Sequence, residues 1–106
     1  MDVRELSASL LRLAEEILPQ TRLHFKRSEK VENKEYNSIH FELQKFVATV
    51  GQNEGWKVTM ARIDDDKEMV LLVGFSNAKE RDAVVKELER QAKKLARKAD
   101  IELKME

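Results

Sequence analysis

The sequence predicts a single α+β domain. Two observations lead to this prediction: apolar residues recur every three or four positions in some stretches and every second position in others. The length of 106 residues suits one domain whose hydrophobic core is stable without a disulfide or a metal ion. The chain has no cysteine, which excludes disulfides, thiolate metal sites and cysteine nucleophiles.

Residues 3–18 predict an amphipathic helix at the N-terminus. Asp2 and Glu5 form a capping-box pattern at its start, and Pro19 ends it. Its apolar side chains fall on one face: Val3, Leu6, Leu10, Leu13 and Ile17. The alternation over residues 21–28 then predicts a half-buried strand, and the polar residues 29–37 predict a loop.

Residues 38–50 fit two patterns. As a helix, the stretch begins at a cap on Asn37 or Ser38 and ends at Gly51 in a left-handed position. As a strand, it alternates over residues 39–43, but the alternation then slips. The helix pattern leaves only Phe41 off the apolar face, so we predict a helix. That face comprises Ile39, Leu43, Phe46, Val47 and Val50.

The second half of the chain predicts a hairpin, a long helix and a last strand. Residues 56–63 alternate, residues 64–67 suit a tight connection, and residues 69–75 are apolar on both faces, as in a central strand. Gly74 inside this run predicts a bulge or a close approach. Asn77 and Glu80 predict the start of the helix. Its core face comprises Val84, Val85, Leu88, Ala92, Leu95, Ala96 and Ala99, and alternation over residues 101–106 predicts an edge strand.

Without the first helix, the predicted order is βαββαβ, the split βαβ plait of the ferredoxin-like class. Both long helices are expected on one face of an antiparallel sheet. The other face is then open, or is covered by the N-terminal helix or by a partner. If residues 38–50 form a strand, the alternative is an N-terminal helix, a four-stranded antiparallel meander, a long C-terminal helix and an edge strand.

The charge balance argues against a general binder of nucleic acids or membranes. The chain has 20 Lys+Arg and 20 Asp+Glu, for a formal net charge of zero. An acid stands where a signal peptide needs basic residues, and the longest apolar run, residues 69–73, is too short to span a bilayer. We therefore expect a soluble, cytoplasmic protein without a membrane partner.

The histidines, acidic residues and serines that could serve catalysis or metal binding each fit an ordinary structural role in this sequence. His24 lies among Arg22 and Lys26 and is expected at the surface, while His40 flanks the apolar face of residues 38–50. The acidic residues 64–66 lack the alternating acids and glycine of a calcium loop, and suit a solvated turn. No serine lies in a nucleophile elbow. We expect no catalysis, no cofactor and no metal.

Two positive patches are candidate nucleic-acid sites. One patch lies along the predicted strand 21–28 and the residues just after it. The other is the C-terminal end of the long helix, where five cations occur with no acid among them. Nearby acids also allow both patches to be ordinary solvated faces. The candidate residues are Arg22, Lys26, Arg27, Lys30, Arg90, Lys94, Arg97 and Lys98.

Residues 67–78, Lys-Glu-Met-Val-Leu-Leu-Val-Gly-Phe-Ser-Asn-Ala, resemble the third strand and second-helix start of the RNA recognition motif family. That family shares the βαββαβ order and stacks bases on aromatic side chains of its open sheet face. This chain has Met69, Leu71 and Val73 in the strand, and no aromatic before Phe75. The resemblance therefore implies weak, salt-sensitive binding to the RNA backbone, and assigns no binding residue.

The predicted function is that of a non-catalytic interaction or scaffold module. Apolar stripes on the two outer strands, Trp56–Val58–Met60 and Ile101–Leu103–Met105, suit an ordinary core or self-association. The expected partner is another protein or a second copy of the chain. Good helix caps and scarce glycine and proline are also typical of a designed or redesigned sequence. The alternative is a weak binder of RNA or single-stranded nucleic acid.

Overall fold

The computed structural model describes residues 19–27, 31–65 and 68–105. The elements follow the order β1 (Gln20–Arg27), α2 (Asn33–Glu54), β2 (Val58–Asp65), β3 (Glu68–Phe75), α3 (Ala78–Lys98) and β4 (Ile101–Met105). This is the predicted βαββαβ order. The helix predicted over residues 3–18 lies outside the described residues.

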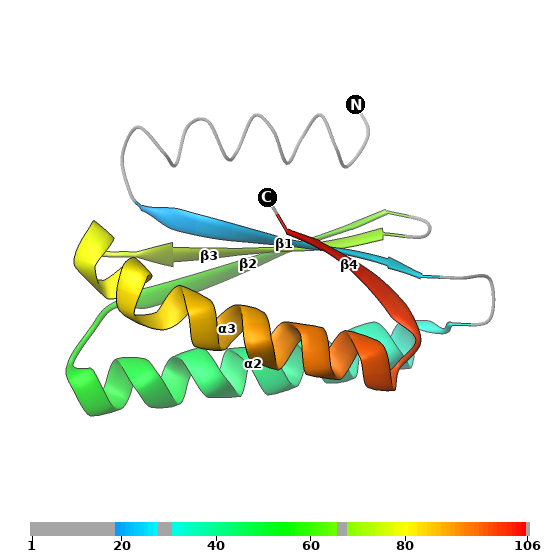
Figure 1. The fold of residues 1–106 in the computed structure, drawn as a ribbon, viewed down its shortest axis with the longest axis horizontal. Coiled ribbons are helices and arrows are strands. Elements are labelled where there is room, and N and C mark those ends of the chain that lie inside the picture. The colour runs from blue at the N-terminus through cyan, green and yellow to red at the C-terminus, as the bar shows by residue number, and fades with distance from the viewer. Residues whose placement is uncertain (1–18, 28–30, 66–67, 106) are drawn as a thin grey trace.

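The four strands form one antiparallel sheet in the order β2-β3-β1-β4. Helices α2 and α3 both lie on the same face of this sheet (Figure 1). β3 and β1 are the inner strands, and β2 and β4 are the edges, as predicted. The alternative meander is wrong, because residues 38–50 lie within α2.

The main core lies between the sheet and the two helices. Every second residue of β1 and β3 points toward the helices, and the buried faces of α2 and α3 meet them. Of the two predicted apolar stripes, Ile101 is buried in this core, and Trp56, Val58, Met60 and Leu103 pack partly buried against it. Side chains with no exposed surface include Leu23, Phe25, Leu43, Met69, Leu71, Val73, Leu88 and Ala92.

Helix α2 is longer than predicted at its N-terminal end. It begins at Asn33, where the backbone N–H of Glu32 donates to the Glu35 carboxylate at 3.0 Å, so the expected cap at residue 37 or 38 is wrong. The added turn is held by Tyr36, which is 2% exposed and whose hydroxyl donates to the Phe25 carbonyl at 3.4 Å. This contact with β1 stabilises helix where the polar sequence predicted a loop.

The C-terminal end of α2 also differs from the prediction. Gly51 lies buried inside the helix, and the left-handed residue is Gly55, with φ 69°. The Gly51 carbonyl accepts a hydrogen bond from the Trp56 backbone N–H at 2.9 Å. A Cβ atom at position 51 would lie 3.0 Å from the Trp56 carbonyl oxygen. Gly51 therefore serves a close backbone approach, and Gly55 ends the helix.

Replacing Gly55 with alanine should lower the free energy of unfolding by about 1–2 kcal/mol, because an L-residue at positive φ is strained. No atom lies within 4 Å of the added Cβ, so the change tests backbone strain alone. Urea denaturation followed by Trp56 fluorescence measures it. Asn53→Ala, exposed in the same turn, is the control. Equal stability of the two variants would contradict the left-handed assignment.

The strand predicted over residues 56–63 is instead β2 over Val58–Asp65, so the first two residues of the predicted connection, 64 and 65, belong to the strand. Two other local predictions are confirmed at residue level. The Asn77 side chain accepts from the Glu80 backbone N–H at 3.0 Å, so α3 begins where its cap predicted. Gly74 pairs with Thr59 across the β2–β3 ladder, and a Cβ atom on Gly74 would lie 2.9 Å from the Thr59 Oγ1. Of the two alternatives for this glycine, the structure shows the close approach.

Candidate polyanion-binding surface

Helix α3 separates its apolar and cationic residues onto opposite faces. Val84, Leu88, Ala92 and Ala96 recur every four residues and are buried against the core. Arg90, Lys93, Lys94, Arg97 and Lys98 follow the spacing of three and four that defines a second face of the helix. Four of these five cations follow Ala92 in the chain. Positive charge is therefore concentrated near the C-terminal end of α3, where the helix dipole favours it.

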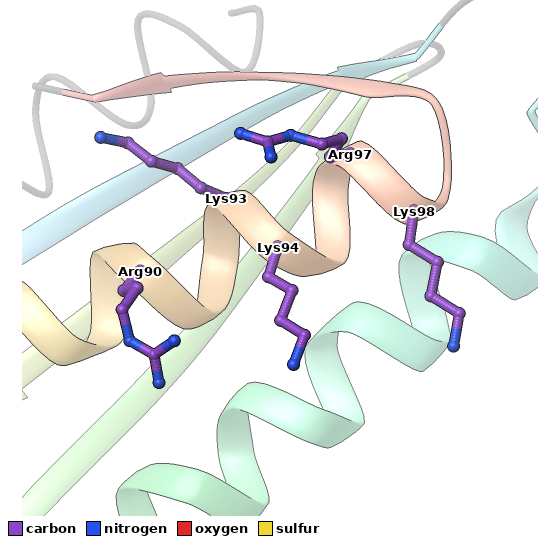
Figure 2. A pocket seen from close by; sticks show the side chains of 5 residues that line it. All are labelled: Arg90, Lys93, Lys94, Arg97 and Lys98. Atoms are coloured by element: carbon purple, nitrogen blue, oxygen red, sulfur yellow. The ribbon is translucent and has the colours of Figure 1, made fainter.

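These five cations line one hollow of about 510 Å³ on α3, and none of the described residues that line it is acidic. Figure 2 shows how the side chains diverge: Lys93 and Arg97 extend toward the side of β4, and Arg90, Lys94 and Lys98 toward the side of α2. We call these five residues the α3 cationic surface.

Arg90 is the one member of this surface with an acidic partner among the described residues. Its Nε atom donates to the Glu87 carboxylate at 2.9 Å, and its Nη2 atom makes a second contact. Hydrogen bonds from Arg90 and Gln91 lower the pKa of Glu87 to about 2. Glu87 therefore stays ionised at all ordinary pH values and offsets the charge of Arg90, which leaves four cations for a ligand.

Acidic residues limit the surface on the side of α2. A second hollow of about 500 Å³ lies between α2 and α3, and Lys98 lines both hollows. Glu35 and Glu42 of α2 line this second hollow. The positive field is therefore strongest over Lys93, Lys94 and Arg97, and weaker beside Lys98.

The cations of β1 lie elsewhere. Arg22 and Lys26 alternate with Leu23 and Phe25, which point toward the helices, so Arg22 and Lys26 point to the opposite face of the sheet. Arg22 is buried, and the Lys26 Nζ atom lies 3.7 Å from the Glu68 carboxylate. The sheet thus separates these two candidates from the α3 cationic surface. Arg27 ends β1, and Lys30 lies outside the described residues.

His24 is not at the surface, contrary to the prediction. It is 6% exposed on the sheet face away from the helices, beside Val70 in the β1–β3 ladder, and its Nε2 atom lies 3.4 Å from the Glu68 carboxylate. Burial lowers the pKa of His24, Arg22 and Lys26 lower it further, and Glu68 opposes them. The sequence pattern identified the neighbouring cations but not the burial.

His40 is at the boundary of the core, as predicted. Its Nδ1 atom lies 3.3 Å from the Nη1 atom of Arg62. The same Nη1 atom donates to the Asn37 side-chain oxygen, and the Arg62 Nε atom donates to the Asp64 carboxylate. Burial, and then the charge of Arg62, lower the pKa of His40. A neutral imidazole can accept a hydrogen bond from the guanidinium, and a protonated one cannot.

The protein should lose stability as the pH falls from about 7.5 to about 5.5, because both histidines have lowered pKa values when folded. The unfolded chain binds these protons near the ordinary histidine pKa of about 6.5, before the folded chain does. Urea midpoints at the two pH values measure the loss. His40→Gln should reduce it, because glutamine keeps a polar group and does not titrate. A wild-type midpoint that rises on acidification would contradict the expectation.

The described part of the chain shows neither a metal site nor a membrane-spanning helix. No three His, Asp or Glu side chains among residues 19–27, 31–65 and 68–105 are placed to hold a metal ion. Neither described helix is both long and apolar enough to cross a membrane. Lys93 belongs to the patch of five cations that the sequence predicted, but it was not among the candidate binding residues.

No protein-family model and no curated protein matches this chain. Among the solved structures that share its architecture are two de novo designed proteins. The de novo designed protein Ferredog-Diesel has a TM-score of 0.56 and 18% identity, over 83% of this chain and 84% of its own. The de novo designed protein LFR1 1 with ferredoxin fold has a TM-score of 0.53 and 15% identity, over 81% and 83%. The chain has the ferredoxin fold. At these identities the likeness concerns the fold alone.

Proposed function

We propose that this chain is a small, non-catalytic interaction or scaffold module. The observation that carries the proposal is the use of its reactive side chains as structural ties. His24 of β1 faces Glu68 of β3, and His40 of α2 contacts Arg62 of β2. The Ser76 hydroxyl donates to the Glu80 carboxylate at 2.7 Å, beside the start of α3. Each group holds two parts of the fold together.

Stability measurements on single substitutions test this proposal. Groups that serve catalysis often lower stability, so their removal is neutral or stabilising, whereas removal of a structural tie destabilises the fold. Ser76→Ala and His40→Ala should each lower the free energy of unfolding by about 0.5–1.5 kcal/mol. A variant at either position that is more stable than the wild type would contradict the scaffold proposal and indicate a functional site.

The origin of the chain is a second part of this proposal. Both structural neighbours are de novo designed, and α3 combines a correct cap, a continuous apolar face and a basic last turn. Such agreement between local signals and the fold is typical of designed sequences. We propose a designed or redesigned sequence without natural activity, placed in the cytoplasm, where a chain without cysteine is at no disadvantage.

Self-association belongs to the same proposal. β2 and β4 each pair with one strand only, so both present backbone groups at the sheet edges to another protein or a second copy. Sedimentation equilibrium across a wide range of protein concentration tests this: the apparent mass should rise with concentration. A constant monomer mass would remove self-association and leave a different protein as the partner.

A second candidate function is weak binding of single-stranded RNA at the α3 cationic surface. The described residues that line its hollow are all cationic, which favours this candidate. From Arg90 to Lys98 the helix rises about 12 Å, which is long enough to meet several backbone phosphates. The described side chains that line the hollow include no aromatic ring. Binding would therefore depend on charge and would show little sequence preference.

The salt dependence of this binding follows from the number of unpaired cations. For single strands, the slope of log K against log salt is about −0.7 for each neutralised phosphate. Four cations therefore predict a slope of about −3. NMR titration with a short, mixed-sequence RNA at low salt should shift the amides of residues 90–98, and the shifts should fade as salt rises.

A matched pair of variants separates this surface from general charge. Lys94→Glu/Arg97→Glu reverses two charges inside the hollow, and Lys79→Glu/Lys86→Glu reverses two exposed charges elsewhere on the same helix. Only the first variant should lose the RNA shifts. Equal losses in both variants, or no shifts in the wild type, would reject a site on α3.

A further inference from the structure

The sheet has a second apolar cluster on the face that lies away from α2 and α3. Val70 and Leu72 of β3 point to this face, and Ile63 of β2 packs against them. Their neighbours along β3 point into the main core, so the strand is apolar on both sides. In Figure 1, both described helices lie on the opposite face.

This second cluster is buried as deeply as the main core. Val70 has no exposed surface, and Leu72 is 7% exposed. None of the described elements, which span residues 19–27, 31–65 and 68–105, lies over this face. Leaving two such aliphatic side chains in water would forfeit about 1.5–3 kcal/mol for each. The face therefore needs an apolar cover.

We propose that this face is the docking surface for residues 1–18 of the same chain. That segment carries one continuous apolar face in its sequence, formed by Val3, Leu6, Leu10, Leu13 and Ile17. Residues 3–18 would span about 24 Å at helical rise, and the eight residues of β3 span about 26 Å. The predicted segment therefore matches β3 in length, and its apolar face matches the cluster of Val70, Leu72 and Ile63.

The start of the described chain favours this segment over a second copy or another protein. The Pro19 carbonyl accepts a hydrogen bond from the Phe75 backbone N–H at 2.8 Å, and Gln20 pairs with Gly74. Pro19, which directly follows the segment in sequence, thus lies beside the end of β3, the strand that carries the cluster. Such a direct connection gives the segment a high effective concentration at the face, which an unlinked partner lacks.

Methyl NOEs in the full-length protein test the proposal. The expected result is a set of NOEs from Leu6, Leu10 or Leu13 to Val70 and Leu72 within one molecule. A sample that mixes labelled and unlabelled chains identifies the source of each NOE. NOEs seen only between chains would overturn the proposal in favour of a second copy, and the absence of NOEs to residues 1–18 would overturn it outright.

A matched pair of substitutions gives an independent measurement. Leu10→Asp places a charge at the centre of the segment's apolar face, and Ala8→Asp places the same charge on the opposite side of the predicted helix. Leu10→Asp should shift the methyl resonances of Val70 and Leu72, and Ala8→Asp should leave them in place. Unchanged Val70 and Leu72 resonances in Leu10→Asp would overturn the proposal.

Discussion

Replacing Leu43 with alanine should lower the free energy of unfolding by about 2–5 kcal/mol, whereas Phe41→Ala should change it by less than about 1 kcal/mol. Leu43 has no exposed surface and lies in the main core, and Phe41 is 61% exposed. The Lys45 ammonium nitrogen lies 5.7 Å from the centroid of the Phe41 ring. The smaller residue therefore has the larger effect.

This pair of variants also decides between the two patterns of residues 38–50. In a strand, positions 41 and 43 share one face, so both substitutions would destabilise the protein by similar amounts. In helix α2 they lie about 200° apart around the axis. Urea denaturation of each variant, followed by circular dichroism, measures the difference. Similar losses for Leu43→Ala and Phe41→Ala would contradict the helix and restore the meander.

Replacing Val70 with aspartate should lower the free energy of unfolding by about 3 kcal/mol or more, because it removes an apolar side chain and places a charge at a fully buried position. The loss is a large part of the total stability of a typical small domain, about 5–15 kcal/mol. Val70 lies on the sheet face away from the helices, so the size of this loss reports how well that face is covered.

Ala61→Asp is the matched control for this substitution. Ala61 lies on the same face of the sheet, opposite Leu72 in the β2–β3 ladder, but on an edge strand and exposed. Its replacement should change stability by less than about 1 kcal/mol. Thermal unfolding of both variants of the full chain compares them. A small loss for Val70→Asp, equal to that of Ala61→Asp, would show that solvent reaches the face.

The elements with strong local signals were predictable in type and place. The cap formed by Asn77 and Glu80 begins α3, the four-residue recurrence of apolar side chains continues it, and the doubly apolar run of β3 defines a central strand. These signals arise between residues close in sequence, so they act in any tertiary context. They were sufficient to predict the βαββαβ order and the ferredoxin-like sheet.

The candidate site was predictable only in part. The helical spacing of Arg90, Lys94, Arg97 and Lys98 placed them on one face, and the same spacing would have included Lys93. Their separation from Arg22 and Lys26 by the sheet depends on which side of β1 packs against the helices. Alternation shows that a strand has two faces, and the tertiary structure determines which neighbour each face meets.

The sequence by itself therefore determined the type and order of the elements and the polarity of their faces. Only the tertiary structure decided where α2 begins and ends, and which polar side chains are buried. The first turn of α2 is helical because Tyr36 reaches the Phe25 carbonyl, and His24 is buried on the sheet face that also carries Val70, beside the Glu68 carboxylate of β3. The physical reason is distance along the chain: these contacts join residues that no local pattern relates, and their burial energy outweighs local preference.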